Sequence, residues 1–199
     1  HRWGELLWSR YFSPSAPSEL RLNSDAGCIV GGLSFGGMIS PFIGDVFQQH
    51  GIPVHCGIRL ATVRYGNQIP ASYAFRWNLL NCLPCGGWRI ARLLAVFYLR
   101  TNFLRRTFAR DEMCRQLVRS PARRCHRVLK MIANWRENEI SHDFPIVQIH
   151  GTHDGIIPFS LVKSPEVIRL ETGHMMTLTR PMEVNREIQS IIRKRSHSM

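Results

Sequence analysis

The sequence predicts an α/β protein with a mostly parallel sheet and helices on both faces. Short apolar runs, bounded by glycine or proline, alternate along the chain with segments whose apolar residues recur at helical spacing. This strand-helix order is typical of sheets whose parallel strands are joined by helical crossovers. The 199 residues, 44% of them hydrophobic and 20% charged, can bury a sizeable core, which excludes a disordered chain, a collagen-like repeat and a disulfide mini-scaffold.

The first elements follow from local patterns. Residues 1–24 are interpreted as a helix followed by a loop, because an aromatic-rich stretch precedes a run of serines and prolines. A buried strand is predicted at 28–30, where Cys-Ile-Val stops at a glycine-rich turn. Apolar residues at helical spacing over 38–47 predict a helix that ends near Gly51. Pro41 lies inside this helix, and we expect it to kink the helix.

Three more strands and a final helix complete the predicted sheet. The strands are expected at 55–63, 144–149 and 167–170, and the helix begins near Pro181, since proline is favoured in a first turn. Arg59 lies in the middle of the first of these strands. A charged side chain is unusual in a parallel strand that is buried on both faces.

A helical insertion, residues 73–139, separates the two parts of the predicted core, 25–72 and 140–199. Between Arg76 and Arg136 there are fourteen basic and two acidic residues, which accounts for the whole formal net charge of +12. Such a segment can attract an anionic substrate, a membrane surface or nucleic acid, and an arginine-rich solvated helix face explains it equally well. No nucleic-acid-binding motif accompanies the charge, so specific nucleic-acid binding is not expected.

The pattern G-x-S-x-G occurs at residues 32–36, between the first predicted strand and the helix that follows it. In this context the turn presents the hydroxyl of Ser34 above the sheet. The glycines are expected because larger side chains would collide across the turn. Gly37 extends the run of small residues, so that the helix can start close to the strand. Alone, the pattern is common.

Two further polar residues follow predicted strands. Asp154 lies in the loop after 144–149, and His174 lies in the loop after 167–170. Open parallel sheets form their active sites at the carboxyl ends of the strands, so we expect both side chains near Ser34. The serine comes first, the acid second and the histidine last, which is one of the known orders of a Ser-His-Asp triad.

Through Gly-Gly-Leu-Ser-Phe-Gly-Gly-Met, His-Gly-Thr-His-Asp-Gly-Ile-Ile-Pro and Glu-Thr-Gly-His, the sequence resembles the α/β-hydrolase superfamily over residues 25–193. The resemblance implies a serine hydrolase that cleaves an ester or similar acyl bond without a cofactor. Ser34 would attack the carbonyl, His174 would move its proton, Asp154 would orient the imidazole, and the backbone N–H of Phe35 would donate to the oxyanion. An acyltransferase would use the same triad.

One part of the superfamily pattern is missing. Only 33 residues precede Ser34, and they contain no His-Gly or Gly-Gly loop after a strand, which in the superfamily supplies a second oxyanion donor. The sequence is therefore interpreted as the C-terminal portion of an α/β-hydrolase fold. Either an N-terminal piece was omitted, or the chain is a truncated, non-catalytic relative.

The basic insertion occupies the position at which this superfamily inserts a cap or lid over its active site. We therefore expect it to help select a small-molecule acyl substrate that is anionic or lipid-like, or to contact an anionic membrane peripherally. Trp77, Trp88 and Phe97 would form an apolar wall of the substrate pocket. The sequence leaves the acyl group and the oligomeric state open.

A metal site is weighed and not favoured. Cys82 and Cys85 form one C-x-x-C pair, and a zinc site would need further ligands such as Cys114, Cys125 and His126, but a second C-x-x-C is absent. The six cysteines are more typical of the reduced thiols of an intracellular protein. The longest apolar stretch is too short to span a bilayer and no targeting segment is recognisable, so a cytoplasmic protein is expected.

Overall fold

The computed structural model describes residues 5–6, 8–13, 26–71, 92–93, 96–97, 108–135 and 141–196. The chain divides into two compact units. One combines residues 1–64 with 139–199, and the other spans 65–138. The first unit holds the sheet and the candidate site.

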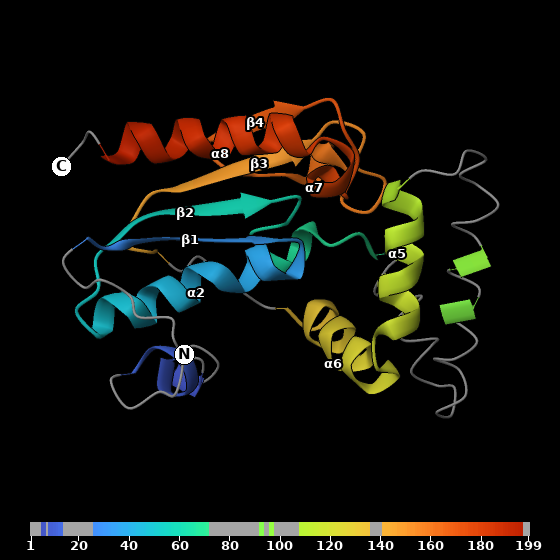
Figure 1. Cartoon of the computed structure of the whole chain (residues 1–199), viewed down its shortest axis with the longest axis horizontal. Helices are drawn as coiled ribbons and strands as arrows, with labels where there is room; N and C mark the ends of the chain where they lie inside the picture. Colours follow the sequence, from blue (N-terminus) through green and yellow to red (C-terminus); the bar gives the residue numbers. More distant parts are fainter. Residues whose placement is uncertain are drawn as a thin grey trace. The chain divides into compact units, whose positions relative to one another are not determined.

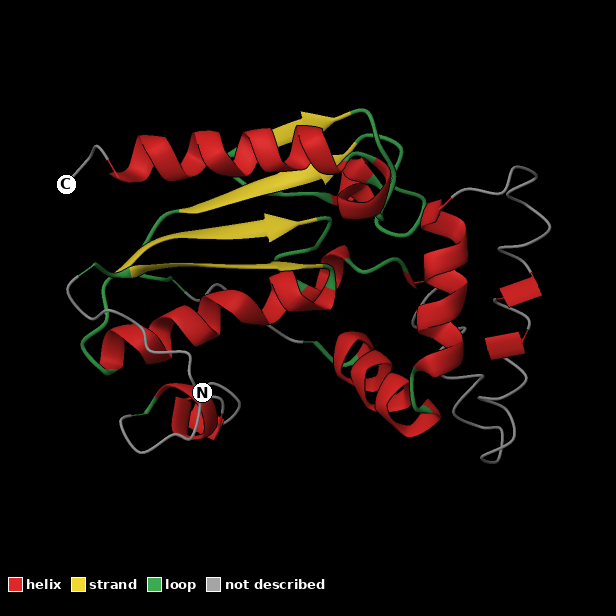
Figure 2. Ribbon diagram, viewed as in Figure 1, coloured by secondary structure: helices red, strands yellow, loops and turns green. Residues whose placement is uncertain are grey.

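The sheet has four parallel strands in the order β1-β2-β3-β4 (Figures 1 and 2). These are β1 (Cys28–Leu33), β2 (Val54–Leu60), β3 (Ile146–Gly151) and β4 (Val167–Leu170). Because all four run in the same direction, their carboxyl ends meet at one edge of the sheet. The α/β class predicted from the sequence is confirmed.

Helices pack on both faces of this sheet, as predicted. On one face, α2 (Phe35–Gln49) packs with Val30 and Phe144 around Phe47. The other face is covered by α7 (Met176–Thr179) and α8 (Pro181–Ser196) (Figure 1). Their apolar side chains pack with those of β2 and β3. Each strand therefore turns alternate side chains to two cores.

The boundaries of three strands differ from the prediction. β1 continues three residues beyond 28–30, because Gly31 to Leu33 pair with β2. β2 ends at Leu60, although burial continues through Val63, because Ala61 adopts a positive φ of 43° and turns the chain out of the sheet. β3 begins two residues late and continues through Gly151, which pairs with Leu170 of β4.

Arg59 lies on β2 as predicted, and its side chain is only 2% exposed. It lines a cavity of about 130 Å³ together with Arg64, Ser141, His142, Phe144, Ile146, Ser164 and Pro165. The imidazole of His142 contacts the carboxylate of Asp45 on α2, with Nδ1 2.9 Å from Oδ1. The cavity thus gives this strand a polar neighbourhood that its apolar pattern does not reveal.

The N-terminal segment contains a π-helical turn, η1 (Trp8–Phe12), which packs on the end of α2. The ring of Trp8 stacks on His50 with 4.1 Å between ring centres, and Phe12 meets Phe47 edge-on at 5.0 Å. Helix α2 continues past Pro41 to Gln49. The aromatic residues of η1 thereby extend the core on the α2 face.

The second unit contains a short 3₁₀ turn, η2 (Gly66–Gln68), and the helices α5 (Phe108–Arg119) and α6 (Ala122–Ala133). Both α-helices lie in the insertion that was predicted to be helical. Helix α6 is basic, with Arg124, Arg127 and Lys130 exposed. In the part of the chain that the structure describes, no helix combines the length and apolar character needed to cross a bilayer.

Candidate active site

Ser34 occupies a strained turn between β1 and α2. Its backbone has a φ of 53° and a ψ of −121°, which a residue with a side chain rarely adopts and which costs on the order of 1–3 kcal/mol. Hydrogen bonds hold the turn on both sides. The N–H of Ser34 donates to the carbonyl of Leu60 at 2.8 Å, and its own carbonyl accepts from the hydroxyl of Thr62 at 2.6 Å and from Gly37 N–H at 2.9 Å.

Two of the three glycines in this turn, Gly32 of the motif and the following Gly37, are required by space. A Cβ at Gly32 would overlap the carbonyl group of Gly36 and lie 2.7 Å from the nitrogen of Gly37, and a Cβ at Gly37 would lie 2.7 Å from Gly32 O and from Thr62 Cγ2. Gly36 differs. Apart from its chain neighbours and the backbone of α2, no described residue lies within 4 Å of the position that a Cβ at Gly36 would take. The expectation that every glycine of the motif prevents a collision is therefore wrong at residue 36.

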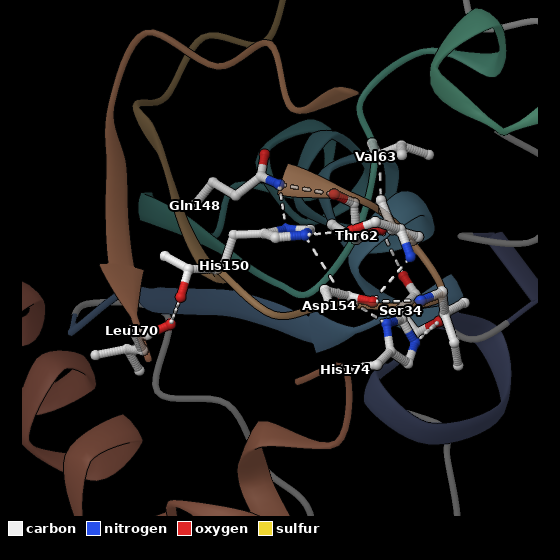
Figure 3. Close-up of polar contacts among 11 residues, drawn as sticks. Ser34, Thr62, Val63, Gln148, His150, Asp154, Leu170 and His174 are labelled. Carbon is white, nitrogen blue, oxygen red and sulfur yellow. Dashed lines mark hydrogen bonds and ion pairs between the residues drawn. The ribbon is translucent and has the colours of Figure 1, made fainter. Parts of the chain in front are cut away.

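The structure brings Ser34, Asp154 and His174 together (Figure 3). The Nε2 atom of His174 lies 3.0 Å from the Oγ of Ser34, and its Nδ1 atom lies 2.8 Å from the Oδ2 of Asp154. An ionised carboxylate only accepts hydrogen bonds, so Nδ1 carries the proton and Nε2 is left to accept one from the serine hydroxyl. The side chain of His174 is 9% exposed and that of Asp154 is fully buried.

Asp154 is held by more than the histidine. Its Oδ1 atom accepts hydrogen bonds from the backbone N–H groups of Ile156 and Ile157, both at 2.8 Å. Burial alone would raise the pKa of this carboxyl group. The hydrogen bond from His174 and the two backbone donors outweigh it, so the pKa is lowered below its ordinary value. The carboxylate is therefore charged near neutral pH.

A close backbone approach joins the loops that carry the acid and the histidine. A Cβ at Gly151 would overlap the carbonyl of Thr172 and lie 3.0 Å from the carbonyl oxygen of Gly173. The N–H of His153 also donates to Thr172 O at 3.1 Å. A glycine at the end of β3 thus lets the loop before His174 lie directly against the loop of Asp154.

Phe35, the expected oxyanion donor, is the first residue of α2. Backbone N–H groups in the first turn of a helix have no acceptor within the helix, and they carry the positive end of its dipole. This N–H is therefore suited to an anion that forms beside Ser34.

Several sequence predictions lie outside this geometry. Trp77 and Trp88, predicted to line the substrate pocket, lie outside the described residues, and so do Cys82 and Cys85 of the weighed zinc site. Phe97 is described and is 66% exposed, and its part in a pocket stays a prediction. Among the described residues no group of three or more histidine, cysteine or carboxylate side chains gathers as metal ligands would.

Three buried polar residues under the site were not predicted to belong to it. Thr62, Gln148 and His150 are each at most 1% exposed, and hydrogen bonds connect them to one another and to the loops of Ser34 and Asp154. His150 is the penultimate residue of β3. A glutamine in the middle of an apolar strand was the available signal, because a buried amide needs partners.

Comparison with solved structures identifies the fold. A thermophilic esterase from Thermogutta terrifontis aligns with a TM-score of 0.61 and 14% sequence identity over 85% of this chain and 65% of its own. A hydrolase from Pseudomonas aeruginosa aligns with 0.56 and 15% over 81% and 63%. An epoxide hydrolase from Bacillus megaterium aligns with 0.57 and 12% over 84% and 70%.

This chain therefore has the α/β-hydrolase fold, as the sequence motifs predicted. It spans about two thirds of the length of these structures. No protein-family model and no curated protein sequence matches the chain.

Proposed function

We propose that this chain is the catalytic part of a serine hydrolase that cleaves an ester or similar acyl bond. The observation that carries the proposal is the position of His174, whose two ring nitrogens lie 3.0 Å from Ser34 Oγ and 2.8 Å from Asp154 Oδ2. This is the geometry by which a serine hydroxyl is activated as a nucleophile. The structural neighbours that are described as esterases and hydrolases are consistent with it.

The chemistry follows in two steps. The Oγ of Ser34 attacks the acyl carbonyl while Nε2 of His174 takes the hydroxyl proton, and the negative charge that develops on the carbonyl oxygen meets the N–H of Phe35. The tetrahedral intermediate then collapses. The bond to the leaving group breaks, and the leaving group takes the proton from His174, which leaves an acyl-enzyme. Asp154 stabilises the imidazolium between these events.

In the second half of the reaction, water attacks the acyl-enzyme with His174 as the base, which releases the carboxylic acid and restores Ser34. An alcohol or amine in place of water would make the same chain an acyltransferase. The identity of the acceptor thus distinguishes the two activities, and product analysis with a competing alcohol measures it.

The direct test is labelling of the folded chain with a fluorophosphonate probe, followed by mapping of the modified residue. Labelling at Ser34 that is lost in Ser34→Ala, together with turnover of p-nitrophenyl acetate, is the expected result. Ser40 offers a matched control, because it is a buried serine on the same helix that follows the turn. Ser40→Ala should keep the labelling. A folded chain that the probe leaves unmodified would contradict the proposal.

A further inference from the structure

A row of buried polar groups runs beside Ser34, His174 and Asp154 (Figure 3). The hydroxyl of Thr62 donates to the carbonyl of Ser34 at 2.6 Å, and the carbonyl of Thr62 accepts from the amide nitrogen of Gln148 at 2.7 Å. The same amide nitrogen lies 3.2 Å from Nδ1 of His150. The imidazole of His150 is completely buried, and its Nε2 atom lies 2.9 Å from the carbonyl oxygen of Ile157.

Two carbonyl groups of this row, those of Thr62 and Ile157, determine where the protons of Gln148 and His150 are. The Thr62 carbonyl can only accept, so the NH₂ group of Gln148 faces it and its second N–H is directed at Nδ1 of His150. Nδ1 is then an acceptor. The Ile157 carbonyl can also only accept, so the proton of His150 is on Nε2. Burial further lowers the pKa of His150, which keeps the ring neutral.

This arrangement holds the turn after Asp154 from both sides. The N–H of Ile157 donates to Oδ1 of Asp154 at 2.8 Å, while the carbonyl of the same residue accepts from His150. In addition, Nε2 of His150 lies 3.4 Å from Oδ2, the oxygen that His174 contacts. Rotation of the carboxylate would therefore break its hydrogen bonds to the backbone turn and move Oδ2 away from His150.

We propose that His150 is a positioning residue, which fixes the carboxylate of Asp154 in the orientation that His174 requires. The inference rests on the proposed hydrolase function and adds a residue to it. His150 acts through Asp154 and not on the substrate itself. Its hydrogen bonds go to Gln148 and Ile157, and its ring is shielded from the space in which a substrate reacts. Gln148 in turn selects the tautomer of His150.

Two substitutions separate the hydrogen bond from the bulk of the ring. His150→Phe keeps a planar ring and removes both nitrogens, while His150→Gln keeps an N–H donor near the position of Nε2. Hydrogen bonds that orient the ligands of a metal are commonly worth about 10- to 100-fold in affinity or activity, and we expect a factor of the same order for an oriented carboxylate. We expect the rate of fluorophosphonate labelling at Ser34 to fall by about that factor in His150→Phe and to stay near the wild-type rate in His150→Gln.

His142→Phe provides the matched control, since His142 is also buried and also contacts an aspartate, but that aspartate is Asp45 on α2. Labelling is compared at a temperature at which circular dichroism shows every variant folded. A general loss of packing would slow both phenylalanine variants alike, whereas a positioning role slows His150→Phe alone. Folded His150→Phe that labels at the wild-type rate would overturn the inference while leaving the proposed function intact.

The tautomer is measured without any activity. In ¹⁵N-histidine spectra of the wild-type chain near pH 7, with the signal assigned by its absence in His150→Gln, we expect a neutral ring protonated at Nε2. A ring protonated at Nδ1, or at both nitrogens, overturns the inference. If the wild-type chain is folded and does not label, the proposed function fails, and this spectrum still decides whether His150 makes the contacts described.

Discussion

Gly32 lies so close to Gly36 that no side chain fits at residue 32, although the sequence motif treats the two glycines alike. The carbonyl of Gly36 occupies the space that a Cβ at residue 32 would need. Residue 36 itself faces open space among the described residues. The motif thus contains one glycine required by contact and one that the local packing does not require.

Gly32→Ala and Gly36→Ala should therefore differ in their effect on stability. A clash with backbone cannot be relieved by rotating a side chain, so we expect Gly32→Ala to lower the free energy of unfolding by about 1–3 kcal/mol or more. Alanine in place of glycine in a helix favours the helix, so Gly36→Ala should be neutral or raise it by up to about 1 kcal/mol. Urea denaturation of both variants measures this, and equal losses would contradict the distinction.

Asp154→Asn should abolish most of the reactivity of Ser34 without unfolding the chain. The asparagine oxygen can still accept from Ile156 and Ile157, but its NH₂ group would face Nδ1 of His174 and favour the wrong tautomer of that ring. A loss on the order of 10⁴-fold in the labelling rate is expected from this type of substitution. Asp45→Asn makes the same change in the other aspartate–histidine pair, and it should label normally.

The buried ring of His150 should make the chain less stable in mild acid. Its pKa is lowered in the folded state, mainly by burial, so the unfolded chain takes up a proton first as the pH falls below the ordinary value of 6.5. The free energy of unfolding then decreases by up to about 1.4 kcal/mol per pH unit for this group. His150→Gln does not titrate and should show a flatter dependence between pH 7 and 5 in urea denaturation.

Asp154 affects stability in a separate and more acidic window. Its lowered pKa stabilises the folded state above the ordinary value of 3.8, and this contribution is lost only as the pH falls through the lower folded value. A flatter curve above pH 5 in His150→Gln would thus report on the histidine alone. An unchanged curve would show that His150 does not titrate differently in the folded and unfolded chain.

Thr62→Val should have a small effect on stability despite the short hydrogen bond that it removes. The carbonyl of Ser34 also accepts from Gly37 at 2.9 Å and from Met38 at 3.3 Å, so the loss of the hydroxyl leaves it satisfied. We expect a cost near the low end for a buried hydrogen bond, about 1 kcal/mol. Thr62→Ser keeps the hydroxyl and serves as the control in thermal unfolding. A cost several times larger would show that the other two donors do not compensate.

The basic segment between Arg76 and Arg136 should make turnover sensitive to substrate charge. We propose that it attracts acyl substrates with an anionic part. Anionic p-nitrophenyl esters should then be cleaved with a higher kcat/KM than neutral esters of the same length, and added salt should reduce the difference by screening the charge. Equal and salt-independent values for both esters would remove this proposal.

The sheet was predictable because its signals are local and strong. The β4 strand begins and ends as its short apolar run predicts, and the helix from Pro181 follows from apolar spacing after a proline. The other strand ends were less accurate. Residues 61–63 are as buried as the strand before them, and the sequence pattern does not reveal that Ala61 turns the chain out of the sheet.

The part of the candidate site that the sequence motifs predicted is the set of three residues that follow strands. Ser34, Asp154 and His174 each follow a strand, and parallel strands bring their carboxyl ends together. The supporting groups could not be found in this way. Gln148 contacts a carbonyl group 86 residues away in the sequence, and His150 contacts one seven residues away, in the loop after β3. Periodicity carries no information about such partners.

Ser34 and His174 also connect the two outermost strands of the described sheet, since one follows β1 and the other follows β4. A slip of one residue in any of the intervening strand pairs would shift the two groups by about 3.3 Å and separate them. The reactivity of a single hydroxyl is therefore an assay of long-range order. During refolding, the appearance of a probe-reactive serine would mark the moment at which all four strands have reached their native register.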